Sequence, residues 1–214
     1  MRFIDLKRIG YLFGNLPIPV YKAIDEEIQE MIDNNFEKCS PFNNNLAGAI
    51  EKEFLLYKSH FIVEEFITEA CKTLIHALGW DDAVGKELEL TRLWVNFQKK
   101  NEYNPIHQHG GHISFVFWHK IPYNAEDERQ VANRITSNLD TPGSFSFNYP
   151  NHNEKGGISQ NYLSIDKTYE GCYAIFPSDL QHTVYPFYTS DDYRISISGN
   201  AKYKDLDYVI KGLD

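Results

Sequence analysis

The stretch LELTRLWVNFQK, residues Leu88–Lys99, marks the point at which the periodicity of the chain changes. Its apolar residues largely alternate with polar ones, and a period of two is typical of a β-strand. Further stretches of the same kind, rich in aromatic and β-branched residues, follow it along the chain. They are ISFVFWHKI (113–121), GSFSFNY (143–149), GCYAIF (171–176) and YRISISGN (193–200). The chain from residue 88 onward is therefore predicted to be mainly β.

Before residue 88 the period is helical. Apolar residues recur every three or four positions in two segments, and Gly79 offers a C-cap for the second. These apolar positions are Ile24, Ile28, Met31 and Ile32 in the first segment, and Ile62, Phe66, Ala70, Leu74 and Ala77 in the second. Residues 125–141 are polar and suit an excursion between two strands. We expect one domain, residues 1–214, in which a mostly helical N-terminal support (1–87) packs against a β-sandwich or barrel of the jelly-roll kind (88–204).

The composition limits the class of protein. Of 214 residues, 42% are hydrophobic and 24% charged, which is typical of a globular domain with its own core. We expect a soluble, unexported protein, because no apolar run approaches the length of a membrane span. Three cysteines in no CxxC arrangement favour a reducing cytoplasm. The net charge of −9 argues against bulk binding of a phosphate backbone, although a local basic groove is compatible with it.

Three histidines fall within NPIHQHGGHIS, residues 104–114. In an extended segment residues i and i+2 share a face, so His107 and His109 present both imidazoles to one side. A third ligand can come from GCYAIFPSDLQHTVYPF (171–187), in which a predicted strand ends in a turn followed by His182. Such a set forms a metal site with open positions, and imidazole suits iron, zinc, copper or nickel. The remaining histidines, expected at surface or hydrogen-bonded core positions, are His60, His76, His119 and His152.

A candidate anion site follows the last of these histidines. In RISISGN, Arg194 and Ser196 lie on one face of a predicted strand. The planar guanidinium of arginine matches the two oxygens of a carboxylate, so Arg194 is placed to hold one, and Ser196 can donate a further hydrogen bond.

These motifs together resemble a known family. The order HxH, GxxxxFPSxLxHxV and RxSxxxN, with LWVNFQKKNEYNPIHQH and SFVFWHKIP, resembles the 2-oxoglutarate/Fe(II) oxygenases of marine tailed phages. That group is a branch of the double-stranded β-helix (cupin-like) oxygenase superfamily, and the resemblance covers roughly residues 88–204. It implies an Fe(II)- and 2-oxoglutarate-dependent dioxygenase that hydroxylates a substrate with release of succinate and CO2. A phage-encoded enzyme would work in the host cytoplasm.

The resemblance also assigns roles to residues. His107 and His182 become iron ligands, Arg194 the anchor of the far carboxylate of 2-oxoglutarate, and Ser196 its helper. Asn96 and Gln98, which share a face of the strand that enters the site, can hydrogen-bond the oxygens of the cosubstrate. An ordinary strand role explains these two residues about equally well.

One position departs from the family pattern, because His109 stands where an Asp or Glu is expected. Three neutral imidazoles leave the metal site one unit more positive than two imidazoles and a carboxylate. Three alternatives remain open at this point: His109 is the third ligand, water completes a two-histidine site, or His112 or Asp179 substitutes. We favour His109, because it shares a face with His107.

Two other classes of function remain compatible with the sequence. A cupin-type metalloenzyme would use the same histidines without 2-oxoglutarate, but it gives no role to Arg194 and Ser196. A non-enzymatic jelly-roll, such as a virion or carbohydrate-binding module, does not require the histidines to converge. For the oxygenase, the sequence does not identify the prime substrate, which can be a peptide side chain, a nucleobase or a small metabolite.

Overall fold

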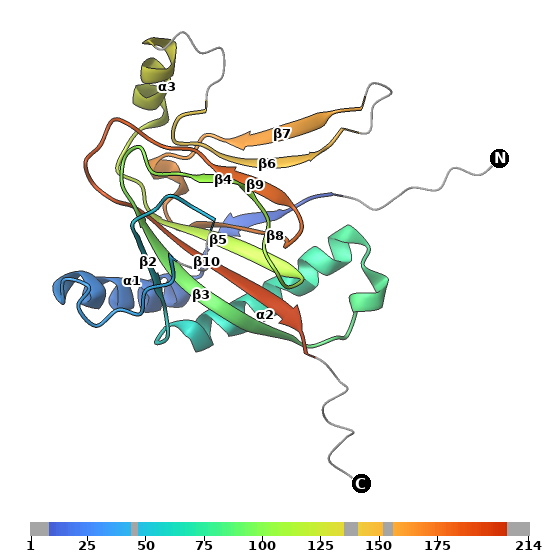
Figure 1. Cartoon of the computed structure of the whole chain (residues 1–214). Helices are drawn as coiled ribbons and strands as arrows, with labels where there is room; N and C mark the ends of the chain where they lie inside the picture. Colours follow the sequence, from blue (N-terminus) through green and yellow to red (C-terminus); the bar gives the residue numbers. More distant parts are fainter. Residues whose placement is uncertain (1–8, 44–46, 135–140, 152–155, 205–214) are drawn as a thin grey trace.

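The computed structural model of the protein describes residues 9–43, 47–134, 141–151 and 156–204. Within them, two antiparallel β-sheets face each other, and two long helices cover the outer face of the larger sheet (Figure 1). The larger sheet has the strand order β1-β8-β5-β10-β3-β2, and the smaller has the order β4-β9-β6-β7.

The helices are α1 (Ile18–Asp33), α2 (His60–Leu78) and α3 (Ala125–Arg134). The strands of the larger sheet are β1 (Leu12–Asn15), β2 (Lys52–Leu55), β3 (Leu88–Gln98), β5 (Ile113–Lys120), β8 (Cys172–Pro177) and β10 (Arg194–Tyr203). The strands of the smaller sheet are β4 (Asn104–His107), β6 (Phe145–Pro150), β7 (Ile158–Leu163) and β9 (Gln181–Val184).

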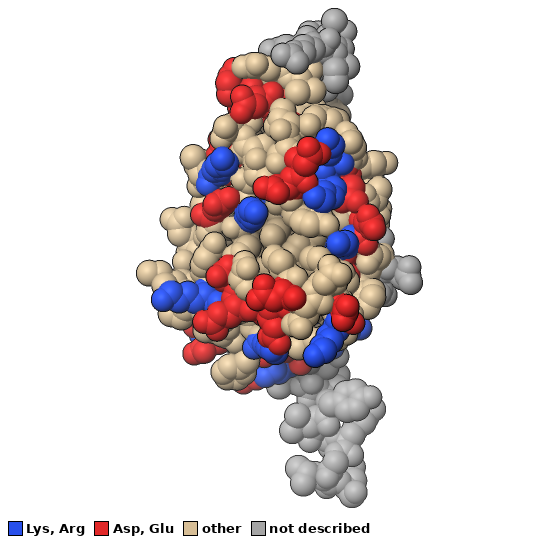
Figure 2. Space-filling view, turned by 90° about the vertical axis from the view of Figure 1, so that its left-hand side faces the viewer, with Lys and Arg blue, Asp and Glu red and all other residues tan. Residues whose placement is uncertain are grey.

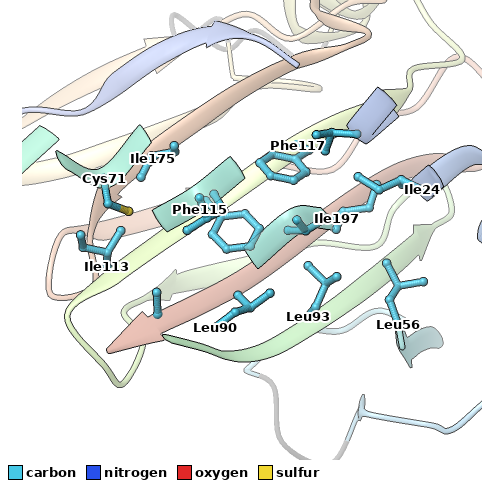
Figure 3. Packing of buried hydrophobic residues seen from close by; sticks show 14 of the residues in the cluster. Ile24, Leu56, Cys71, Leu90, Leu93, Ile113, Phe115, Phe117, Ile175 and Ile197 are labelled. Atoms are coloured by element: carbon cyan, nitrogen blue, oxygen red, sulfur yellow. The ribbon is translucent and has the colours of Figure 1, made fainter. Parts of the chain in front are cut away.

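A hydrophobic core lies between the helices and the larger sheet. Strand alternation turns Val95 and Phe97 of β3 toward the helices, so Asn96 and Gln98 face the smaller sheet. Figure 3 shows how the two layers meet, with sheet residues packed against side chains of α1 and α2. The residues labelled there are Ile24, Leu56, Cys71, Leu90, Leu93, Ile113, Phe115, Phe117, Ile175 and Ile197. This core fixes the larger sheet as a platform for its inner face.

A second, aromatic cluster lies between the two sheets. It includes Trp118 of β5, Phe176 of β8, and Phe145 and Phe147 of β6. Phe145 and Phe147 pack with ring centroids 5.0 Å apart, and Phe147 packs on Phe176 at the same distance. Because these rings come from both sheets, they set the spacing between the sheets and leave polar side chains of β3 and β10 beside them.

The predicted mainly β fold with N-terminal helices is confirmed at this level. Gly79 caps α2 with a φ of 66°, a left-handed conformation that suits glycine. The N-terminal region is not only helical, however, because β1 and β2 form the two edges of the larger sheet. Each is four residues long, LFGN and KEFL, which is too short to carry a period of two. The helix α3 occupies the start of the predicted excursion.

Some predictions lie outside the described residues. These are the ends of the proposed domain at residues 1 and 214, the last part of the excursion at 135–140, and His152. Among the helices that the structure describes, none combines the length and the apolar character needed to cross a membrane.

Candidate functional site

Three histidines converge between the sheets. His107 ends β4 and lies directly opposite His182 of β9 in the strand ladder, while His109 follows two residues later. Their potential ligand atoms all lie within 4.8 Å of one another, and the Nε2 atoms of His109 and His182 are 3.2 Å apart. Two nitrogens that bind one ion at right angles, with bonds of about 2.1 Å, would lie about 3 Å apart. The spacing therefore fits adjacent positions around one metal ion.

Backbone carbonyls orient two of the rings. The Nδ1 of His107 lies 2.7 Å from the Pro105 carbonyl oxygen, and the Nδ1 of His182 lies 3.0 Å from that of Leu180. Since a carbonyl only accepts, both Nδ1 atoms carry the proton, and each Nε2 keeps its lone pair. Such outer contacts fix the tautomer of metal-binding histidines.

The environment keeps the three rings neutral. Burial lowers the pKa of His109 to about 4, and the neighbouring His107 adds to that shift. Burial, with smaller effects of His107 and His109, holds the pKa of His182 well below its usual range. The pKa of His107 is also lowered by burial, although its hydrogen bond to Pro105 opposes the change. Neutral imidazoles are the form that binds metals.

The alternative ligands lie elsewhere. His112 and Asp179 line a separate surface pocket together with Lys86. The Nδ1 of His112 accepts a hydrogen bond from the backbone N–H of Tyr203 at 3.3 Å. Within the described part of the chain, the histidine cluster comprises His107, His109 and His182 and no other potential ligand.

A cavity of about 150 Å³ connects the histidines to the polar residues of the larger sheet. Aromatic residues of the second cluster form part of its wall. The sequence-predicted site residues that line it are His107, His109, His182, Arg194, Ser196, Asn96 and Gln98. The structure thus brings every one of them to the same space.

Arg194 is buried in this cavity, with 3% of its surface exposed. Its Nε and Nη2 both donate to Oε1 of Gln98, at 3.1 and 2.6 Å. Its Nη1 donates to the Tyr123 hydroxyl at 2.7 Å and the Gly143 carbonyl at 2.9 Å, and Nη2 also donates to the Tyr185 carbonyl at 3.0 Å. Among the described residues, no carboxylate pairs with this cation. In the described part of the chain, this buried charge is in contact with neutral acceptors.

The other polar residues have distinct tasks. Asn96 donates from Nδ2 to the carbonyl and hydroxyl oxygens of Ser196, both at 3.3 Å, while its own Oδ1 is buried without a donor among the described residues. The role of Asn96 toward the cosubstrate therefore stays a prediction. Ser196 accepts from Asn96 and keeps its O–H available to a ligand. Gln98 donates from Nε2 to the Glu102 carbonyl at 2.6 Å, which sets the orientation of its amide.

Sequence reasoning missed Tyr123 and Gly143, which complete the shell around Arg194. Tyr123 is 3% exposed, donates its hydroxyl proton to the Gly143 carbonyl at 2.8 Å and stacks on Phe187. Tyr123 lies outside the predicted strands, and Gly143 is the first residue of the predicted strand GSFSFNY, where nothing in the sequence marks its carbonyl as a partner of an arginine. Both contacts depend on tertiary structure.

Comparisons with known proteins identify a family and a fold for this chain. A family model described as "Putative 2OG-Fe(II) oxygenase" matches residues 92–200, about half of the chain. No curated protein sequence matches. Among solved structures, a prolyl-4-hydroxylase of Pseudomonas putida is similar with a TM-score of 0.53 and 13% identity, covering 92% of this chain and 94% of its own. A Trichoplax adhaerens prolyl hydroxylase in complex with a hypoxia inducible factor peptide fragment has a TM-score of 0.52 and 13% identity, with coverages of 92% and 84%. Both likenesses concern the fold and confirm the predicted jelly roll.

Proposed function

Because the chain belongs to the 2OG-Fe(II) oxygenase family, we propose that it is a dioxygenase that hydroxylates its substrate while 2-oxoglutarate is converted to succinate and CO2. Fe(II) is the metal and 2-oxoglutarate the cosubstrate of this family, and the catalytic core is the double-stranded β-helix. Bound Fe(II) supplies oxygen activation, which is coupled to the oxidative decarboxylation of the cosubstrate.

The histidine cluster fits such a metal. His107 and His182 would hold it through Nε2, because their Nδ1 atoms are bonded to carbonyls. His109 is proposed as the third ligand, in place of the carboxylate expected in the family. Its Nε2 lies next to that of His182, and the alternative residues His112 and Asp179 line another pocket. A site of three neutral imidazoles keeps the full positive charge of the ion, which favours an anionic cosubstrate.

One observation carries the proposal, namely the buried positive charge of Arg194 in the same cavity as the histidines. Burying a charge without a counter-ion is unfavourable, so the cavity is electrostatically complete only when an anion enters it. 2-Oxoglutarate provides a carboxylate at its far end for Arg194, and Ser196 has an O–H to donate to it. A cupin-type enzyme without this cosubstrate, or a non-enzymatic jelly roll, would leave that cation unexplained.

The remaining residues of the cavity exclude water and shape the space. Trp118, Phe145 and Phe176 form an apolar wall beside the polar floor, and Phe145 stacks on the ring of His182. A dry wall strengthens the electrostatic contacts that Arg194 makes with an anion. The prime substrate stays open among a peptide side chain, a nucleobase and a small metabolite.

We also propose that the protein works in the cytoplasm, which would be that of the host if a phage encodes it. The free thiols of Cys39, Cys71 and Cys172 support a reducing compartment. On the face turned to the viewer in Figure 2, basic side chains are interspersed with acidic ones, which does not favour bulk nucleic-acid binding there.

An anaerobic titration tests the proposed function. Fe(II) is added to the purified protein, 2-oxoglutarate follows, and the visible metal-to-ligand charge-transfer band is recorded. We expect stoichiometric metal binding and a band that saturates with 2-oxoglutarate. Metal binding without the band would favour the cupin-type enzyme, and the absence of metal binding would favour the non-enzymatic protein.

A further inference from the structure

Gln98 makes an unusual contact with Arg194. One amide oxygen accepts hydrogen bonds from both Nε and Nη2 of the guanidinium, at 3.1 and 2.6 Å. These two nitrogens form the edge that a carboxylate binds with two parallel bonds. The single amide oxygen of Gln98 therefore occupies the position where a carboxylate would place two oxygens.

The orientation of the Gln98 amide follows from its other end. Its Nε2 donates to the Glu102 carbonyl at 2.6 Å, so Oε1 must face Arg194. The carboxylate of Glu102 in turn accepts from the backbone N–H of Lys99 at 2.7 Å and of Glu51 at 3.0 Å. The turn that holds Gln98 is thus fixed by several independent contacts.

The other acceptors around Arg194 are less able to leave. The Gly143 and Tyr185 carbonyls belong to the backbone. The Tyr123 hydroxyl is buried and also bonded to Gly143. Gln98 is the one side chain among these described partners that both lines the cavity and holds the two-nitrogen edge. If an anion is to reach Arg194 directly, Gln98 is the partner that it can replace.

We propose that Gln98 is a placeholder for the cosubstrate: its amide oxygen occupies the Nε/Nη2 edge of Arg194 in the free protein and gives way to the far carboxylate of 2-oxoglutarate. This inference rests on the proposed function, because it concerns the cosubstrate pocket. A carboxylate supplies two acceptor oxygens and a negative charge, whereas the amide supplies one oxygen and no charge, so the exchange favours the ligand.

The side chain at position 98 then determines whether Arg194 can bind the carboxylate of the cosubstrate. A glutamine satisfies the N–H groups of Arg194 but leaves its charge uncompensated. A glutamate at the same position would bring a permanent counter-ion and compete with the cosubstrate. Gln98 is therefore a specificity-determining residue, since it reserves Arg194 for an acid that arrives from solution.

The test compares Gln98→Glu with the native protein, both loaded anaerobically with Fe(II). Two ligands are titrated: 2-oxoglutarate, and pyruvate, a 2-oxo acid that lacks the far carboxylate. We expect Gln98→Glu to raise the Kd of 2-oxoglutarate at least about tenfold and to change that of pyruvate less than about threefold. Gln29→Glu adds the same charge on an exposed position of α1 and should change neither Kd. A structural disturbance of the metal site would affect both ligands.

A second variant keeps the test decisive if Gln98→Glu is unstable, because its new oxygen faces the Glu102 carbonyl. Gln98→Met removes the amide without adding charge. Its Kd for 2-oxoglutarate should be no higher than the native value, since the ligand supplies the acceptor itself and no longer has to displace the amide. The gain in melting temperature on adding 2-oxoglutarate should increase, because free Gln98→Met leaves two buried N–H groups without a partner.

Each outcome has one meaning. Native affinity for 2-oxoglutarate in Gln98→Glu, or a loss in Gln98→Met as large as that in Arg194→Ala, would overturn the placeholder role. Failure of the proposed function looks different, because the native protein itself would then show no 2-oxoglutarate band or no preference for 2-oxoglutarate over pyruvate.

Discussion

At the scale of single residues, the histidine cluster owes its geometry to the backbone. Two rings are fixed by carbonyls two positions before them, Pro105 for His107 and Leu180 for His182. Both strands thus orient their own ligand locally. His109 lies outside β4, and its backbone N–H donates to the Ser178 carbonyl at 3.0 Å. The third imidazole is held by the connection after β8, so its position depends on the pairing of distant segments.

The first prediction concerns His109. His109→Leu removes one of three proposed ligands and should weaken Fe(II) binding at least about 100-fold, since even outer contacts of a metal site contribute about 10-fold to 100-fold. His109→Asp should retain the metal, because it restores the carboxylate usual in the family. His112→Leu is the matched control and should bind Fe(II) normally. Binding is measured by anaerobic calorimetry, and native affinity in His109→Leu would leave a two-histidine site.

The second prediction concerns Arg194. Arg194→Ala should weaken 2-oxoglutarate binding by about 30-fold to 1,000-fold, which corresponds to the loss of about 2 to 4 kcal/mol from a buried charged pair. Arg194→Lys should recover only part of the affinity, because a point charge does not reproduce the planar fork. Fe(II) affinity should be unchanged in both. Arg92→Ala, at an exposed position of β3, serves as the control. Unchanged 2-oxoglutarate binding in Arg194→Ala would refute the anchor.

At the scale of elements, buried glutamates join segments that are distant in sequence. Glu27 of α1 accepts hydrogen bonds at Oε1 from the N–H groups of Tyr57 and Lys58, and at Oε2 from the N–H and hydroxyl of Ser59. These groups belong to the three residues before α2, of which Ser59 is the N-cap residue. Glu27 therefore caps the entry to α2 from another helix.

The third prediction concerns this cap. Glu27→Gln replaces one acceptor oxygen with an NH2 group that faces two donors, so it should lower the free energy of unfolding by about 2 to 3 kcal/mol. Glu26→Gln, the exposed neighbour, should change it by less than about 0.5 kcal/mol. Urea denaturation followed by circular dichroism measures both. Equal stability of the two variants would show that the cap contributes little.

The fourth prediction concerns Glu53 of β2, which is 1% exposed and has an unpaired Oε1 among the described residues. Burial, with a smaller effect of Glu102, raises the pKa of its carboxyl from 4.5 to about 7. A raised pKa means that the folded protein holds the proton more tightly than the unfolded chain. The protonated carboxyl of Glu53 makes its full contribution to the free energy of unfolding below pH 4.5. This contribution is lost as the pH rises through about 7.

Glu53→Gln cannot ionise and should therefore gain stability relative to the native protein as the pH rises from 5 to 8, by an amount on the order of 2 to 3 kcal/mol. Unfolding free energies of both proteins across this range provide the measurement. Glu51→Gln, at an exposed position, is the control. A pH-independent difference between native protein and Glu53→Gln would contradict the raised pKa.

The elements differ in how far the sequence could predict them. Strands β3, β5, β8 and β10 were recognisable because long aromatic or alternating runs persist through a sheet that is covered by helices. The four-residue strands β1, β2, β4 and β9 take their conformation from their partners.

The histidines could be selected by spacing, whereas the contacts of Arg194 with Tyr123 and of Glu27 with the entry to α2 depend on tertiary structure. The buried face of α2 also differs, since Val63, Ile67 and Cys71 are fully buried rather than Ile62, Phe66 and Ala70.

At the scale of the whole molecule, the proposed ligands divide between the two sheets. His107 and His182 belong to the smaller sheet, and Arg194 and Ser196 belong to the larger one (Figure 1). The larger sheet is supported on its outer face by α1 and α2. A metal alone would link β4 with β9, whereas 2-oxoglutarate bound to that metal would also join the smaller sheet to β10.

The last prediction follows from this division and is measured by hydrogen exchange of backbone amides. Fe(II) alone should slow exchange in β4 and β9, because a ligand that binds only the folded form suppresses local opening by mass action. Addition of 2-oxoglutarate should slow exchange further in β4 and β9 and extend the protection to the Arg194 end of β10. At a concentration about 100 times its Kd, the ligand stabilises the folded form by about 2.7 kcal/mol. Helix α2, on the opposite face of the larger sheet, should change least.

In Arg194→Ala the protection due to Fe(II) should persist, and the additional protection due to 2-oxoglutarate should be lost. If 2-oxoglutarate protected β10 equally in that variant, the cosubstrate would not join the two sheets through Arg194.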